Sequence, residues 1–124
     1  MSTLNEWPLS DLSGRELDLA PVRPLLDRIV SRWKPREVWL FGSRARGEAT
    51  AESDWDLLVV VPDATPDSEL DPLVAWDVQK DIRLPADVIP TPASSFDDYR
   101  SVVNTLAYEA THFGIQLPSW ALTR

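Results

Sequence analysis

The chain has 124 residues, no cysteine, a single histidine and a formal net charge of −8 at pH 7. This length supports one hydrophobic core, and the composition excludes disulfides, zinc–thiolate centres and histidine-rich metal sites. The charge is uneven, with a balance of +2 in residues 1–47 and of −10 in residues 48–124. Such an acidic surface repels phosphate backbones, so we do not expect binding to nucleic acid.

The N-terminal segment lacks the pattern of a folded element, and the sequence shows no membrane or export signal. Residues 1–20 mix polar, proline and glycine positions without periodicity, so we expect a flexible leader followed by a single domain over residues 21–124. No apolar run reaches the ~20 residues that cross a membrane. The N-terminus also lacks the basic and apolar pattern of a signal peptide. We therefore expect a cytoplasmic protein without membrane contact.

The first half of the predicted domain alternates between helix and strand. Apolar residues recur at helical spacing over residues 22–33, which predicts an amphipathic helix. Residues 37–41 form a short run rich in aromatic and β-branched side chains, as strands do. Gly42 breaks that strand, and we expect Ser43 to cap a brief helix that runs through residue 46. Residues 54–61 are nearly all apolar after the first three, which indicates a central strand buried on both faces.

The second half continues the alternation. Asp71 and the proline after it are typical of a helix start, and Leu73, Val74, Val78 and Ile82 are its expected apolar stripe. A third strand is predicted over residues 86–89, and a final helix runs from residue 95 or 99 to residue 113. This order of elements predicts an α/β (α+β) fold, in which a small mixed sheet is flanked by helices.

Three aspartates stand at the starts of predicted strands. Asp54 and Asp56 lie on one face of their strand, roughly 6.5–7 Å apart, while Trp55 points to the other face and packs. Asp87 opens the third strand and would join them if the two strands are neighbours. Magnesium prefers such oxygen ligands, and a two-metal site stabilises the attacking and leaving oxygens of an in-line displacement. The three acids are therefore the candidate catalytic and metal-binding residues.

A glycine–serine turn precedes the acids. Gly42 lets the backbone approach a phosphate closely, and Ser43 stands where a helix offers free amides. Arg44 and Arg46 follow and could clamp phosphate oxygens. The turn matches neither the phosphate loop ending in Gly-Lys-Ser/Thr nor the dinucleotide fingerprint. Each piece alone is commonplace as a turn, a strand cap or a solvated helix face, so it is their combination that indicates a nucleotide site.

The combination resembles a known family. Residues 22–113 are similar to the DNA polymerase β-like nucleotidyltransferase superfamily, and in particular to its minimal nucleotidyltransferases. The resemblance implies a mixed-sheet palm that transfers a nucleoside monophosphate from a nucleoside triphosphate, ATP above all, to an acceptor hydroxyl. Its specific part is confined to five positions: Gly42, Ser43, Asp54, Asp56 and Asp87.

The resemblance also implies a role for each of those positions. Gly42 and Ser43 would hold the triphosphate, and the acid pair at 54 and 56 would bind both magnesium ions. Asp87 would bind one of the ions and help activate the acceptor hydroxyl. Arg44 and Arg46 match positions that are often basic in minimal members. The chain departs from the family at Trp55, where a small aliphatic residue is usual, and Glu109 is given no catalytic role.

The acceptor and partner are expectations from the same resemblance. Minimal nucleotidyltransferases typically pair with a helical HEPN-type protein in a toxin–antitoxin system, and can act as antitoxin by adenylylating it. Little chain follows Asp87, so we expect a partner protein or a second copy of the chain to complete the site. Two alternatives stay open. One is a non-catalytic module that masks such a partner, and the other is a transferase acting on tRNA or a small molecule.

Overall fold

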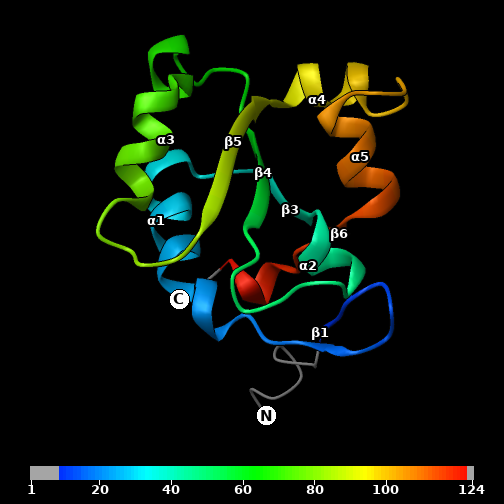
Figure 1. The fold of residues 1–124 in the computed structure, drawn as a ribbon. Coiled ribbons are helices and arrows are strands. Elements are labelled where there is room, and N and C mark those ends of the chain that lie inside the picture. Colours follow the sequence, from blue (N-terminus) through cyan, green and yellow to red (C-terminus); the bar gives the residue numbers. More distant parts are fainter. Residues whose placement is uncertain (1–8, 123–124) are drawn as a thin grey trace.

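The computed structural model describes residues 9–122. Within them, four strands form one mixed sheet in the order β5-β4-β3-β6, with helices on both faces (Figure 1). The predicted α/β fold with a small mixed sheet is therefore confirmed. The strands of this sheet are β3 (Glu37–Phe41), β4 (Trp55–Val61), β5 (Ala86–Pro92) and β6 (Ile115–Gln116).

The helices divide between the two faces of the sheet. Helices α1 (Arg23–Trp33) and α3 (Pro72–Gln79) cover one face, and α4 (Ala93–Tyr99) and α5 (Leu106–Phe113) cover the other (Figure 1). The short α2 (Ser43–Arg46) follows β3 directly. Three 3-10 helices complete the described elements: η2 (Ala20–Val22), η3 (Asp67–Leu70) and η4 (Ser119–Ala121). No helix among residues 9–122 is long and apolar enough to cross a membrane.

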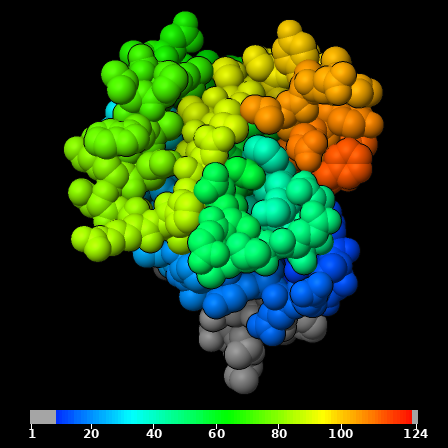
Figure 2. All heavy atoms as spheres, viewed as in Figure 1, coloured from blue at the N-terminus to red at the C-terminus, as the bar shows by residue number. Residues whose placement is uncertain are grey.

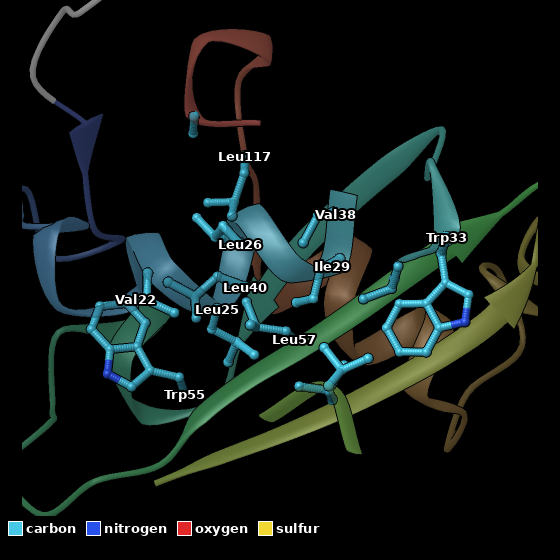
Figure 3. Packing of buried hydrophobic residues seen from close by; sticks show 14 of the residues in the cluster. Val22, Leu25, Leu26, Ile29, Trp33, Val38, Leu40, Trp55, Leu57 and Leu117 are labelled. Atoms are coloured by element: carbon cyan, nitrogen blue, oxygen red, sulfur yellow. The ribbon is translucent and has the colours of Figure 1, made fainter. Parts of the chain in front are cut away.

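Strand β4 separates two hydrophobic clusters. Leu57, Val59 and Val61 face the cluster beneath α1 and α3, and Leu58 and Val60 face the cluster beneath α4 and α5. Side chains alternate along a strand, so an apolar run of this length is buried on both faces, as the sequence predicts. Figure 3 shows the α1 cluster, in which residues from α1, β3 and β4 interdigitate.

This alternation also orients the start of β4. Trp55 is 1% exposed and lies in the α1 cluster, at the opposite end from Trp33 (Figure 3). Because neighbouring residues in a strand point to opposite faces, Asp54 and Asp56 face the side that α4 and α5 cover. The packing of Trp55 behind the predicted site is therefore confirmed.

The edge strand β5 is longer than the sequence predicts. It runs parallel to β4 and continues past the predicted end at residue 89 to Pro92. Pro90 and Pro92 are tolerated because β5 lies at the edge of the described sheet, where an amide need not pair on the outer side. The prolines also remove donors from an edge that could otherwise pair with another chain.

The predicted final helix is wrong in extent, because it is two helices. Helix α4 ends at Tyr99, and α5 begins at Leu106. Thr105 starts the second helix: its hydroxyl lies 3.2 Å from the Tyr108 amide, from which it accepts. The same hydroxyl lies 2.8 Å from the carbonyl oxygens of Tyr99 and Val102, to which it donates. This cap turns the chain between the helices and shapes one wall of a cleft described below.

The apolar stripe predicted for α3 is wrong in part. Asp71 caps the helix as predicted, accepting a 2.8 Å hydrogen bond from the Leu73 amide. The residues of α3 that are buried are Ala75 and Val78, whereas Leu73 is 74% exposed and Trp76 is 60% exposed. Two large apolar side chains therefore face solvent on this helix.

The segment expected to be a flexible leader is structured from its ninth residue. Residues 1–8 lie outside the described residues. After them, β1 (Leu9–Ser10) and β2 (Glu16–Leu17) pair as a small antiparallel hairpin. The Leu12 amide, between the two strands, donates to the Ala45 carbonyl of α2 at 2.8 Å. The hairpin therefore contacts α2 and helps to hold it in position.

Candidate functional site

The predicted acids meet at one end of the sheet. Strands β4 and β5 are parallel, and their register pairs Asp56 with Asp87. Neighbouring strands lie about 4.8 Å apart, and paired residues point to the same face. Asp54 precedes β4 by one residue and shares the face of Asp56. The structure thus places all three acids that the sequence singles out at the same end and on the same face of the sheet.

The charges of these acids repel one another. Burial, followed by the charges of Asp87 and Asp54, raises the pKa of Asp56, and nearby Arg46 only partly offsets this. Within residues 9–122, no three His, Cys, Asp or Glu side chains lie close enough together to hold a metal ion as they stand. The three carboxylates thus share one face of the sheet without forming a closed set of metal ligands. Carboxylate oxygens are the kind of ligand that magnesium prefers.

Gly42 places the turn directly against Asp56. Its backbone has φ +78° and ψ −160°, a conformation essentially confined to glycine. A methyl group in place of its hydrogen would overlap the Asp56 carboxylate. The glycine is therefore required twice, by the turn and by the acid beside it.

Ser43 differs from its predicted role in the helix. The N-cap of α2 is Gly42, and Ser43 is the first helical residue, so its hydroxyl does not close the helix end. The Ser43 carbonyl instead accepts from the amide of Glu48 at 2.9 Å, which closes the far end of this short helix. Ser43 remains next to the Gly42 turn and partly exposed.

Arg44 is the predicted site residue that the structure does not bring to the acids. Its guanidinium donates to the Ser53 carbonyl at 2.9 and 3.1 Å and to the Thr50 carbonyl at 3.2 Å. It also lies over the Trp55 ring, 4.5 Å from the centroid. Arg44 thus fastens the segment that leads into Asp54, from the face of β4 opposite the acids.

Arg46 lies on the side of the acids. It pairs with Glu48 at 3.0 Å and with Glu109 of α5 at 3.8 Å, and its charge acts on Asp56. Both pairs are half-exposed, so each contributes little to stability and can exchange for another anion. Glu109, to which sequence reasoning gave no role, therefore belongs to this neighbourhood.

Two hollows lie beside Asp56 and Asp87. One is a cleft of about 690 Å³ lined by Gly42, Asp56 and residues of α5. The other, of about 340 Å³, is lined by Asp87 and by residues of α3 that include Trp76. Figure 2 shows this face of the molecule, on which the orange α5 segment lies beside the teal residues that include α2. The two carboxylates thus border separate spaces, one on each side.

The cleft also holds aromatic residues that sequence reasoning missed as site residues. Tyr108 and Phe113 line it, from the side of α5 away from the buried Ala107 and Ala110. A signal was present, since two aromatics on the polar side of a helix have no core to fill. The prediction of one continuous helix up to residue 113 hides this signal, because the structure has two helices there.

Comparison with known proteins agrees with this geometry. A family model described as "Nucleotidyltransferase domain" matches residues 22–108, which include Gly42, Ser43 and the three aspartates. No curated protein matches the chain at a significant level.

Proposed function

Since the chain belongs to the nucleotidyltransferase domain family, we propose that it transfers AMP from ATP to a hydroxyl on a partner protein in a magnesium-dependent reaction. The observation that carries the proposal is the register of Asp56 with Asp87, directly beside the Gly42 turn. Carboxylates on adjacent strands next to a close backbone turn can hold a metal-carried triphosphate at one place.

The residues divide the work of the reaction. The acceptor oxygen attacks the α-phosphorus, the bond from that phosphorus to the oxygen bridging the β-phosphate breaks, and pyrophosphate leaves. Asp87 takes the proton of the hydroxyl, while Gly42 and Ser43 hold the triphosphate. Asp54, Asp56 and Asp87 would hold the magnesium ions. Bound magnesium supplies neutralisation of the triphosphate and of the charge that develops on the leaving oxygen.

A protein acceptor is supported by the surface beside Asp87. The hollow that Asp87 lines is bordered by Trp76, and Leu73 lies exposed on the same helix. Exposed apolar side chains gathered in this way are typical of protein contact surfaces. The balance of −10 in residues 48–124 favours a partner with a basic surface. Resemblance to minimal nucleotidyltransferases supports a HEPN-type toxin as that partner, with this chain as its antitoxin.

The test is transfer of label from ATP labelled at the α-phosphate, with magnesium and the proteins that co-purify with this chain. The Asp54→Ala/Asp56→Ala double variant removes the acid pair. Its matched control is Asp67→Ala/Asp98→Ala, which removes two exposed carboxylates on η3 and α4 and changes the net charge equally. We expect label on one protein with the wild type and the control, and none with the acid-pair variant.

Each other outcome points elsewhere. A stable complex that accepts no label from any nucleotide would contradict the transferase proposal and favour a module that masks its partner. Label that depends on the acid pair but appears on RNA or a small molecule would keep the chemistry and overturn the protein acceptor. Label that persists in the acid-pair variant would overturn the assignment of the site.

A further inference from the structure

The cleft beside α5 combines two unlike kinds of lining. It is lined by Gly42 and Asp56 and, from α5, by Tyr108, Phe113 and Leu106. Its volume of about 690 Å³ is within the usual range of small-molecule sites. A carboxylate beside a close turn and a group of aromatic side chains in one cleft offer a surface to each part of a nucleotide, its phosphates and its base.

The aromatic side chains of α5 contact one another. His112 stacks on the Tyr108 ring with centroids 3.8 Å apart and planes 17° apart. The His112 ring is itself held by a 3.0 Å contact from its Nδ1 to the Tyr108 carbonyl oxygen. Phe113 meets the Tyr108 ring edge-on, with centroids 6.3 Å apart. Rings that restrict one another in this way lose less side-chain entropy when a ligand stacks on them.

Two apolar side chains of the cleft are half-exposed to solvent. Phe113 is 48% exposed and Leu106 is 47% exposed, although both line a concave surface. A flat aromatic ligand would cover them without disturbing the core, because α5 already buries Ala107 and Ala110 beneath. A ligand that stacks in the cleft would remove these two apolar side chains from solvent.

The polar side chains of the cleft offer little to read the edge of a base. The Thr105 hydroxyl is engaged with three backbone groups, and Glu109 pairs with Arg46. Asn104 is exposed, with its backbone at φ +71°, and carries an amide that can contact a base edge. We attribute the choice between purines and pyrimidines mainly to stacking area.

We propose that the cleft binds a purine nucleoside triphosphate, with its base stacked on Phe113 and in contact with Tyr108, and with its phosphates toward Gly42 and Asp56. The inference rests on the proposed function, to which it adds the residues that select the nucleotide. Stacking favours the larger purine ring over pyrimidines but separates adenine from guanine poorly. GTP is then a competitor of ATP at this site.

The test is calorimetric binding of non-hydrolysable α,β-methylene analogues of ATP, GTP, CTP and UTP in the presence of magnesium. We expect the two purine analogues to bind within a factor of about five of each other and both pyrimidine analogues more weakly. Phe113→Ala and Tyr108→Ala should weaken purine binding about tenfold each, the scale of losing one stacked ring. Tyr108→Phe keeps the ring and should bind as the wild type does.

Tyr99→Ala is the matched control, since Tyr99 is also a half-exposed aromatic but lies at the end of α4, outside the cleft. It should bind every analogue as the wild type does. Circular dichroism melting of each variant verifies that it is folded. Equal loss of affinity in Tyr99→Ala and Phe113→Ala, or unchanged affinity in both cleft variants, would overturn the proposal.

Tripolyphosphate is the probe that separates this inference from the function on which it rests. Its affinity should be unchanged in Phe113→Ala, because it has no base. Aromatic-dependent binding of purine analogues without any label transfer would sink the transferase proposal and keep the base site. Label transfer with an unchanged KM for ATP in Phe113→Ala would do the reverse.

Discussion

Replacing Gly42 by alanine tests the contact between the turn and the acids. At φ +78° and ψ −160° a side chain costs about 1–3 kcal/mol of backbone strain. The added methyl group also overlaps the Asp56 carboxylate, which must move. We therefore expect a loss of about 3 kcal/mol in the free energy of unfolding, which lowers the melting temperature by about 12 °C in a domain of this size. Because Asp56 is displaced, AMP transfer should fall about 100-fold or more.

Gly14→Ala is the matched control, since Gly14 has φ +91° but has nothing within 4 Å of the added carbon. It carries backbone strain without overlap, so we expect a loss of about 1 kcal/mol and unchanged transfer. Melting followed by circular dichroism and transfer of labelled AMP measure the two effects separately. The reasoning is refuted if the two variants lose the same stability and keep the same activity.

Three further predictions concern single side chains. Because burial and neighbouring acids raise the pKa of Asp56, its contribution to stability is present below its ordinary pKa and is lost as the pH rises through the raised value. In EDTA, Asp56→Asn should therefore be more stable than the wild type at pH 7, on the order of 0.5 kcal/mol, and equal to it near pH 3; a less stable variant at pH 7 would contradict the repulsion. Arg44→Lys loses a two-pronged grip on backbone carbonyls, so it should cost about 1–2 kcal/mol and leave the KM for ATP unchanged, whereas a raised KM at full stability would show a phosphate ligand. Asp71→Ala removes the cap of α3 and should cost about 1 kcal/mol in urea unfolding, with transfer retained; no change in the urea midpoint would show that the cap is not needed.

Much of the fold could be predicted because its strands carry strong local patterns. The strand over residues 37–41 was predicted with its observed bounds, and β4 was predicted to within one residue. What escaped prediction depends on distant partners. Strand β6 has two residues and exists because β3 pairs with it, and the hairpin before η2 is equally short. The break before α5 depends on hydrogen bonds of the Thr105 hydroxyl. The spacing of apolar residues does not reveal such a break.

The same distinction between local patterns and distant partners applies to the candidate site. Gly42, Asp56 and Asp87 could be located because a turn, a strand face and a strand start are all local features, and the parallel register of β4 with β5 then joined them. Arg44 is predicted to contact phosphate because it lies beside the turn. In the structure it donates to carbonyl groups six and nine residues further along, which no sequence pattern marks. The place of Phe113 in a cleft could not be predicted, because the cleft forms where residues 103–113 lie beside the ends of β3 and β4.

The central claim is that the acids of β4 and β5 jointly hold divalent cations that accompany a nucleotide. It is tested most directly by paramagnetic resonance titration of manganese, in place of magnesium, with the α,β-methylene analogue of ATP. The account predicts two bound ions per chain in the wild type and in Asp98→Asn, and loss of both in Asp56→Asn. Unchanged manganese binding in Asp56→Asn, or no binding in the wild type, would contradict it.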